Sequence, residues 1–284
     1  MVKTAAYFPL QCSLNSVSVM GAVLSSLQGV GISTQENSMT SDCAVIWSVL
    51  WAGRMSANRA VYEHYRAQGR PVIIIEIGAL DRGTTWKVSV NNTTADGYYG
   101  HTENLDWDRP KHLGIQLSSQ SKARPEIVIA LQHSQSLQVA GISNMAQWVY
   151  NTVQQVREHT DRPVLVRPHP RSRITLPQLP VDVTLQQPKR LHNTYDSFNF
   201  DTGYHAVINY NSGPGTQAAI SGTRPLVDRT SLAAPVGIDL TNIEQPYTID
   251  RAQWLTEICH TEYTLEELQK GTWLKRIAPA LQVP

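Results

Sequence analysis

The sequence predicts an α/β fold with two Rossmann-like halves, a cleft between them and a helix at the carboxyl end. Short apolar runs of strand length alternate with helical stretches along the 284 residues, as in a parallel sheet covered by helices. The alternation is interrupted near residues 115–125, so we expect one half to span residues 1–120 and the other residues 121–284. Each half then has roughly the 100–200 residues of one domain.

The first half is expected to contain two buried strands joined by a helix. Cys43–Val49 and Pro71–Ile77 have the apolar composition of buried strands. Asn58–Gln68 has helical composition and ends at Gly69, soon followed by a proline, which is a typical helix end. From Asp81 to Gly114 the periodicity disappears among Gly, Asn, Thr and Asp. Long irregular connections are usually functional or disordered, so we expect a functional loop there.

The second half continues the alternation. Strands are expected at Glu126–Leu131, Pro163–Val166, Val181–Leu185, Ala206–Asn209 and Arg224–Asp228. Helices are expected at Ser143–His159, from about Gln217 to Ser221, and from Asp250 to Arg276. Within the last stretch, Thr264 and Glu267 have the spacing of a capping box.

Composition and charge restrict the function classes. A formal net charge of +1 excludes a strongly basic footprint over the whole protein, although a local basic groove remains compatible with it. No stretch approaches the ~20 apolar residues of a membrane helix, and no signal-peptide segment is visible, so we expect a cytoplasmic protein without membrane contact. The three cysteines lack CxxC spacing and the histidines lack HExxH spacing. We therefore expect neither a metal nor a resident cofactor.

The segment 167–173 concentrates cationic side chains directly after a predicted strand. Arg167, His169 and Arg171 alternate with two prolines that hold the segment extended. Ligands of open α/β sheets bind beyond the carboxyl ends of the strands, and arginine binds phosphate in bidentate fashion. The segment therefore predicts an anion site, with a solvated basic turn as the alternative.

The segment 209–222 also follows a predicted strand, and it opens a helix. Gly213 and Gly215 allow close backbone approach, and Ser212 and Thr216 supply hydroxyl groups. A helix amino terminus offers N–H groups to a phosphate. A plain strand–turn–helix connection is the alternative, and the absence of a Walker lysine disfavours ATP hydrolysis. Together, the two segments predict a diphosphate site.

A general base is expected in or beside the long loop of the first half. The candidates are Glu76 at a strand end, followed by Asp81, His101 and Asp106. Carboxylates and imidazoles are the side chains that accept a proton near neutral pH. Spacing does not choose among them, and most loop acids are only solvated. Aromatic side chains in the same loop could stack on a sugar or a base, or pin the loop to the core.

The two cation- and glycine-containing segments resemble a known family. A strand with Arg-Pro-His-Pro, followed about forty residues later by a strand with Asn-Ser-Gly-Pro-Gly-Thr-Gln and a helix, resembles the carboxyl half of GT-B glycosyltransferases. The likeness is to capsule-polysaccharide (Kdo-type) transferases and to phage-encoded, DNA-modifying glycosyltransferases. It implies donor contacts from these residues: Arg167, His169, Arg171, Ser212, Gly213, Gly215, Thr216 and Gln217. Residues 72–83 resemble the acceptor side of these relatives, and residues 254–273 are similar to the carboxyl ends of phage homologues.

The resemblance implies a metal-independent glycosyltransferase with a nucleotide sugar as co-substrate. Residues 1–120 would form the acceptor side and residues 121–284 the donor side. A phage origin would make a 5-hydroxymethylpyrimidine in duplex DNA the acceptor and the host cytoplasm the location. A saccharide-directed, capsule-type transferase, a non-catalytic module for nucleotides or polyanions, and a nucleotide-sugar epimerase are the alternatives.

Overall fold

The computed structural model describes residues 2–119, 124–172, 174, 182–188 and 203–281. The chain divides into two compact units. Unit 1 comprises Met1–Arg109 together with Glu257–Pro284, and unit 2 comprises Pro110–Thr256. Each unit has its own sheet and its own apolar core.

The sheet of unit 1 has six strands in the order β11-β5-β4-β3-β1-β2. Their bounds are Thr4–Tyr7 (β1), Ser33–Glu36 (β2), Cys43–Trp47 (β3), Val72–Ile77 (β4), Thr85–Val90 (β5) and Glu262–Thr264 (β11). Strands β1 to β4 are parallel, β5 is antiparallel to β4, and β11 is antiparallel to β5. The parallel strands β3 and β4 are apolar along most of their length because both faces of this part of the sheet are covered.

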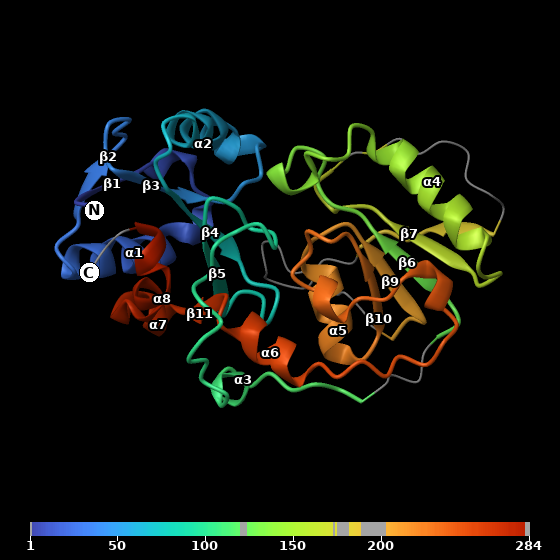
Figure 1. Cartoon of the computed structure of the whole chain (residues 1–284). Coiled ribbons are helices and arrows are strands. Elements are labelled where there is room, and N and C mark those ends of the chain that lie inside the picture. Colours follow the sequence, from blue (N-terminus) through green and yellow to red (C-terminus); the bar gives the residue numbers. More distant parts are fainter. Residues whose placement is uncertain (1, 120–123, 173, 175–181, 189–202, 282–284) are drawn as a thin grey trace. The chain divides into compact units, whose positions relative to one another are not determined.

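Helices cover the two faces of this sheet, as Figure 1 shows. Their bounds are Val17–Gly29 (α1), Asn58–Ala67 (α2), Leu265–Lys270 (α7) and Thr272–Leu281 (α8). The short helix Arg109–His112 (α3) lies where the chain passes from unit 1 to unit 2. Side chains of α1, α7 and α8 join the core on one face, which includes Ile73 and Ile75 of β4 and Val88 of β5. Helix α2 packs on β3 and β4 from the other face. Strand β5 therefore presents alternate residues to two different environments.

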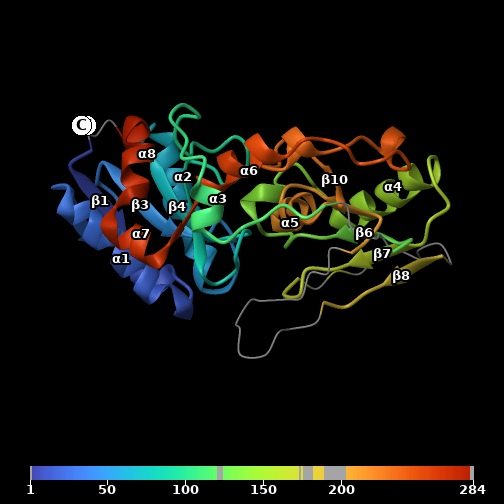
Figure 2. The ribbon, with the colours of Figure 1, turned by 90° about the horizontal axis from the view of Figure 1, so that it is seen from below.

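The sheet of unit 2 has five parallel strands in the order β10-β9-β6-β7-β8. The strands are Ile127–Ala130 (β6), Val164–Arg167 (β7), Val183–Leu185 (β8), Ala206–Asn209 (β9) and Arg224–Val227 (β10). The helices are Met145–Arg157 (α4), Gly213–Ser221 (α5) and Ala252–Cys259 (α6), the last of which contains the boundary between the units. Helix α4 joins the core on one face, and α5 contributes Ala218 to a smaller cluster with Val128 and Val207. Figure 2 shows β6, β7 and β8 side by side.

The predicted strands and helices agree with the structure except in three stretches. The expected irregular loop from Asp81 to Gly114 contains β5 and the short α3. The expected helix from Asp250 to Arg276 is interrupted by β11. Strand β11 pairs with β5 because its three residues reach the free edge of that strand. Residues 4–36, for which no element was predicted, supply β1, α1 and β2.

The division into domains also differs from the expected boundary at residue 120. The chain leaves unit 1 after Arg109, and Glu257–Pro284 belongs to unit 1 rather than to the second half. The physical reason is the β5–β11 pairing together with the burial of Trp273 and Leu274 in the core of unit 1. The acceptor-side and donor-side roles of the two halves remain predictions.

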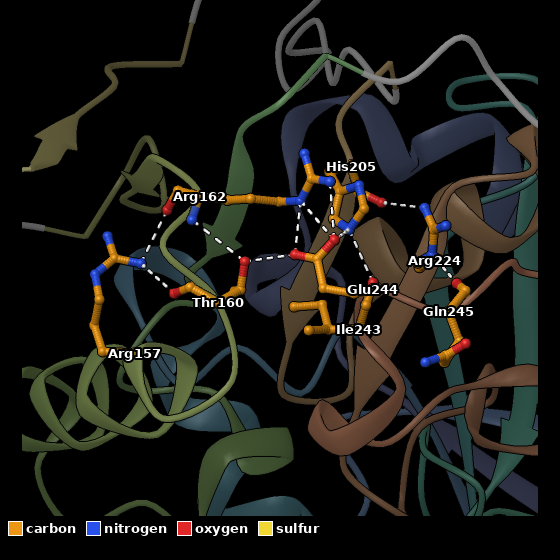
Figure 3. A network of polar contacts seen from close by, with 8 residues as sticks. All are labelled: Arg157, Thr160, Arg162, His205, Arg224, Ile243, Glu244 and Gln245. Atoms are coloured by element: carbon orange, nitrogen blue, oxygen red, sulfur yellow. Dashed lines mark hydrogen bonds and ion pairs between the residues drawn. The ribbon is translucent and has the colours of Figure 1, made fainter.

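A network of ion pairs and hydrogen bonds joins the amino-terminal ends of three strands of unit 2 (Figure 3). The Arg162 guanidinium donates through Nε and Nη2 to both carboxylate oxygens of Glu244, at 2.8 Å each for the shortest contacts. Thr160 Oγ1 also donates to Glu244 Oε1. His205 Nε2 lies 2.8 Å from the Ile243 carbonyl oxygen and 3.7 Å from Glu244 Oε2. The network thus ties the segment before β7 to the segment before β9.

Glu244→Gln is expected to lower the free energy of unfolding of unit 2 by about 1 kcal/mol at pH 7, because the partly exposed pair is screened by solvent. The Arg162 hydrogen bonds hold the pKa of Glu244 at about 2. A depressed carboxyl pKa stabilises the fold above the unfolded value of about 4.3, and this contribution disappears as the pH falls toward 2. Urea melts at pH 7 and pH 3 test this: the difference between the variant and the wild type should shrink at pH 3. An equal difference at both pH values would contradict the assignment.

Candidate functional site

The two adjacent strands β6 and β9 form the topological switch point of the unit 2 sheet. From β6 the chain continues to β7 and β8 on one side, and β9 then returns to the other side of β6. Ligands of open α/β sheets bind in the crevice at this point, outside the carboxyl ends of the strands. Asn209, the last residue of β9, donates from Nδ2 to the Ala130 carbonyl oxygen at 2.8 Å and so ties the two strand ends together.

Directly beyond the switch point, two amide side chains bind each other. Gln132 Nε2 donates to Asn211 Oδ1 at 2.9 Å, and the Asn211 backbone N–H donates to Gln132 Oε1 at 2.9 Å. Asn211 Nδ2 donates in addition to the Gln138 carbonyl oxygen and to Thr230 Oγ1. Both side chains are at most 6% exposed. This pair joins the segments that follow β6 and β9 at the candidate site, and Gln132 was not predicted from the sequence.

The segment beyond β7 places its cations at different depths. Arg167 is 7% exposed and lies inside the protein, whereas His169 is half-buried and Arg171 is exposed. The Arg171 backbone N–H donates to His169 Nδ1 at 3.2 Å. Of the three predicted phosphate contacts, His169 and Arg171 are therefore accessible at the surface. The burial of Arg167 argues against direct contact between its side chain and a ligand. Arg173 lies outside the described residues.

His133 forms a pair with His169, and sequence reasoning missed it. The two ring centroids are 5.3 Å apart, edge to face. His133 Nδ1 accepts the Gln135 backbone N–H at 3.2 Å, just as His169 Nδ1 accepts that of Arg171. A neutral imidazole that accepts at Nδ1 carries its proton on Nε2, so both rings are Nε2–H donors. Burial lowers the pKa of His133, and the charge of Arg171 lowers it further, against a hydrogen bond with the Arg171 backbone that raises it.

A repeated pattern in the sequence could have indicated His133. Strand β6 is followed by Leu131-Gln132-His133, and strand β7 by Pro168-His169. Both of these buried strands are therefore followed by a histidine within three residues. Adjacent parallel strands end at the same edge of a sheet. Two histidines at these positions are therefore expected to meet.

Helix α5 begins at this edge, after Ser212. The Ser212 backbone N–H donates to Asn209 Oδ1 at 2.7 Å, which fixes the turn between β9 and the helix. The N–H groups of a first helical turn favour an anion. In α5, however, Pro214 has no N–H and the Gly215 N–H donates to the Ser212 carbonyl oxygen at 3.2 Å, so Gly213 supplies the N–H group for an anion. Thr216 is 4% exposed, whereas Gly213 and Gln217 are half-buried. The α5 amino end is thus positioned for an anion, with Gly213 and Gln217 more accessible than Thr216.

Gly215 has a packing role. A Cβ atom at this position would lie 2.7 Å from Val227 Cγ1 and 3.7 Å from the Ala233 Cβ. The glycine therefore lets α5 approach β10 closely. This contact explains Gly215 without a ligand, in contrast to the close approach to a phosphate that the sequence suggested.

A small pocket adjoins His169. It is lined by Leu131, Gln132, Ser134, Met145, His169, Ser172 and Ile174, and its volume of about 260 Å³ includes space that is open to solvent. Sites that enclose a drug-sized ligand have roughly 300–1,000 Å³, so this pocket by itself does not enclose one.

The four predicted base candidates lie in unit 1, where they differ in environment. Asp81, His101 and Asp106 are exposed. Glu76 is part-buried at the end of β4, and its Oε1 accepts the Val49 backbone N–H at 3.1 Å. Burial raises the pKa of Glu76 against hydrogen bonds and positive charges that lower it. Glu76 therefore differs from the other three candidates in being part-buried and held by a backbone hydrogen bond.

The described residues show neither a metal site nor a membrane span. The residues that the structure describes contain no group of three or more His, Cys, Asp or Glu side chains that could hold a metal ion. None of the helices in this part of the chain is long and apolar enough to cross a membrane.

Comparison with known proteins shows the fold. No protein-family model matches the chain, and no curated protein matches it either. The solved structure of KpsC, a beta Kdo 2,4 transferase from Thermosulfurimonas dismutans, matches with a TM-score of 0.51 at 11% identity, covering 92% of this chain and 90% of that chain. The same organism's beta Kdo 2,7 transferase matches with a TM-score of 0.45 at 12% identity, covering 96% and 99% of the two chains. The glycosyltransferase SnogD from Streptomyces nogalater gives only 0.24 at 9% identity, covering 98% and 100% of the two chains.

The first of these matches is the one that bears on the fold. It confirms the predicted fold class, α/β with two Rossmann-like units. At 11% identity the likeness concerns the fold alone.

Proposed function

We propose that this chain is a glycosyltransferase that takes a sugar from a nucleotide-sugar donor and transfers it to an acceptor hydroxyl. The observation that supports the donor site most directly is the gathering of the His133–His169 pair, Arg171 and the α5 amino end at the carboxyl edge of the unit 2 sheet. These groups are hydrogen-bond donors or cations, as a diphosphate requires. The fold shared with a Kdo transferase agrees with this chemistry.

The donor site is expected to act on the leaving group. As the bond from the sugar to the diphosphate breaks, negative charge grows on the diphosphate oxygens, and preorganised N–H donors stabilise it. The Nε2–H group of His169, which lies beside the His133 ring, and the Gly213 N–H at the start of α5 would supply that stabilisation without a metal. Ser212 and Gln217 lie beside them at the start of the helix. Arg167, Gly215 and Thr216 are buried and would support the site by holding the strand end and the helix in place.

For the acceptor, we propose a hydroxyl that is deprotonated by a base of unit 1, with Glu76 ahead of Asp81, His101 and Asp106. A 5-hydroxymethylpyrimidine in duplex DNA and a saccharide both carry such a hydroxyl. The saccharide acceptor has the support of a fold shared with a transferase of the sugar Kdo. The DNA acceptor has only the resemblance of the sequence segments behind it, so the experiment must offer both.

The test is a donor panel with both acceptors. The purified chain is incubated with UDP-, GDP- and CMP-sugars, alone, with a saccharide mixture, or with duplex DNA containing 5-hydroxymethylcytosine or 5-hydroxymethyluracil. Mass spectrometry then detects added sugar. Consumption of one donor with a mass gain on either acceptor supports the proposal and identifies the acceptor. Nucleotide binding without consumption of any donor would favour a non-catalytic module.

His169→Ala is expected to raise the dissociation constant of the consumed nucleotide sugar about tenfold, because hydrogen bonds to charged groups contribute about 1.5–3 kcal/mol. Isothermal titration calorimetry measures the change. His159→Ala is the matched control, since His159 is exposed in the same unit, just beyond the carboxyl end of α4 and away from the strand ends. Equal affinity of His169→Ala and the control would contradict the assigned donor site.

A further inference from the structure

Two turns of the same pattern follow the adjacent strands β6 and β7. Residues 133–136 have the sequence His-Ser-Gln-Ser, and residues 169–172 have the sequence His-Pro-Arg-Ser. In each turn the backbone N–H of the closing serine donates to the carbonyl oxygen of the histidine at 3.0 Å. In each turn the histidine Nδ1 also accepts the N–H of the residue two positions later, at 3.2 Å. Both turns therefore hold the ring of their own histidine in a fixed orientation.

The two turns face each other beyond the strand ends. Ala130 and Arg167, the last residues of β6 and β7, are in register, and His133 and His169 follow them by three and two residues. The two rings lie edge to face, with centroids 5.3 Å apart and an angle of 76° between the ring planes. Residues of both segments also line the pocket beside His169. The His133 ring thus lies against the turn that carries two of the predicted donor contacts.

The second nitrogen of the His133 ring binds the backbone of the other turn. Burial and the charge of Arg171 lower the pKa of His133, whereas a hydrogen bond with the Arg171 backbone raises it. A hydrogen bond raises the pKa of an imidazole when the ring is the donor. Because Nδ1 already accepts the Gln135 N–H, the proton is on Nε2, and Nε2–H donates to the Arg171 carbonyl oxygen. His133 therefore connects its own turn with the turn 169–172.

The two histidines differ in what their side chains face. Both ring nitrogens of His133 bind backbone groups, and the ring is half-buried against that of His169. His169 lines the pocket, and Arg171 beside it is exposed. His133 is thus placed to act through its neighbour, whereas His169 and Arg171 are placed to meet a ligand.

We propose that His133 is a positioning residue of the donor site, which holds the turn 169–172 in the arrangement that lets His169 and Arg171 contact the same anion. Without this connection the turn would have to be ordered at the moment of binding, and that ordering weakens affinity. Donors that are already oriented avoid this cost. The assignment rests on the proposed transferase function, because it takes His169 and Arg171 as contacts of the nucleotide sugar. His133 itself does not touch the ligand.

Two amide variants separate the connection between the turns from the turn itself. His133→Asn keeps the turn 133–136, because an asparagine side chain accepts the N–H two residues later, but it is too short to reach Arg171. His133→Gln has a longer side chain whose amide N–H extends toward the Arg171 carbonyl oxygen, so it should restore the connection. His159→Asn is the matched control, since His159 is exposed in the same unit and lies away from the strand ends.

The first measurement is made on the chain without a ligand. Proton–nitrogen NMR of labelled histidines at about pH 8, where ordinary imidazoles are neutral, reports which ring nitrogen of His169 carries the proton. We expect the Nε2–H form in the wild type, in His133→Gln and in His159→Asn. In His133→Asn we expect a mixture of both forms, because the Arg171 N–H is no longer held at His169 Nδ1. His169 signals that are unchanged in His133→Asn, or that are lost in His133→Gln, would overturn the proposal.

The second measurement is the affinity for free CMP, UDP and GDP by isothermal titration calorimetry. His133→Asn is expected to raise the dissociation constant of the nucleotide that binds by about tenfold, as for residues that orient histidines in metal sites. His133→Gln and His159→Asn should stay close to the wild type. Weaker binding by His133→Asn together with unchanged His169 signals would mean that His133 contacts the nucleotide itself, which contradicts the positioning role.

The positioning role and the proposed function fail in different experiments. If the wild type binds none of the nucleotides and consumes no nucleotide sugar, the proposed donor site is wrong, whatever the NMR signals of His169 show. If the wild type binds a nucleotide and His133→Asn binds it equally well, only the role of His133 is wrong.

Discussion

Arg109→Met is expected to lower the free energy of unfolding of unit 1 by about 3–5 kcal/mol, the cost of removing one partner of a buried ion pair. The Arg109 side chain is 8% exposed and pairs with Glu267 at 2.6 Å. Its guanidinium also donates to the Cys259 and Glu262 carbonyl oxygens, at 2.6 and 2.5 Å. One side chain thus satisfies three acceptors on the segment that carries β11 and α7. Methionine fills similar space but leaves all three acceptors without a donor.

Denaturant melts followed by fluorescence measure this loss, since Trp47, Trp86 and Trp273 belong to unit 1. The control is Arg59→Met, because Arg59 and Glu63 form an exposed i,i+4 pair whose side chains are 63% and 59% exposed. Such pairs contribute at most a few tenths of a kcal/mol. A loss for Arg109→Met no larger than that of the control would show that the carboxyl-terminal segment is held by its apolar contacts alone.

The Arg109–Glu267 pair also has a pH dependence. Burial raises the pKa of Glu267, but the hydrogen bonds from Arg109 and Thr264 outweigh it and leave the pKa below its ordinary value. A depressed carboxyl pKa stabilises the fold above the unfolded pKa, and the contribution is lost as the pH falls through the folded pKa. The difference between the wild type and Arg109→Met should therefore be largest near neutral pH and should shrink in acid.

Gly78→Ala is expected to destabilise unit 1 by about 3 kcal/mol or more, on the scale of large overpacking effects. A Cβ atom at this position would lie 2.3 Å from Glu262 Oε2 and 2.5 Å from the Thr85 carbonyl oxygen. The Thr85 carbonyl is held in a backbone hydrogen bond from the Gly78 N–H, so it has no room to move away. The Glu262 carboxylate accepts hydrogen bonds from the Ala79 and Leu80 backbone N–H groups and from the Thr85 hydroxyl. The added methyl group would push it out of these hydrogen bonds and leave a buried carboxylate without partners.

Gly21→Ala is the control for this substitution. Gly21 lies inside α1, and a Cβ atom there would meet nothing within 4 Å. Alanine at such a helical position stabilises by about 0.5–1 kcal/mol. Thermal melts of the two variants should therefore shift in opposite directions. A shift of Gly78→Ala within one degree of the wild type would contradict the close packing around Glu262.

Strand β5 shows where prediction from the sequence was wrong and why. Thr85-Trp86-Lys87-Val88-Ser89-Val90 alternates polar and apolar residues, which is the period of a half-buried strand. The surrounding Gly, Asn and Asp residues outweighed this short signal and led to the prediction of a loop. The prediction of one continuous helix in the carboxyl-terminal segment was wrong for another reason. Strand β11 has only three residues, and it adopts a strand conformation because β5 offers a free edge. No local pattern predicts such a pairing.

Some residues of the candidate site could likewise be predicted from the sequence, and others could not. The histidine and glycine turns after β7 and β9 could be found because each follows a buried strand of clear composition. His133 and Gln132 were missed because their importance lies in partners far along the chain, His169 and Asn211. In unit 1, Glu76 was predicted without Lys87 and Glu262, which are its neighbours only through the register of β4, β5 and β11.

The sequence by itself determined the α/β class, most of the strands and helices, and the turns at the carboxyl edge of the unit 2 sheet, because hydrophobic periodicity and turn residues are local properties. The tertiary structure alone decided which side chains meet. Strand order places Glu262 beside Lys87, 175 residues away along the chain, and burial separates Arg167 from the exposed Arg171. Contacts across strands depend on register and topology, which follow from the packing of the whole unit rather than from any short segment.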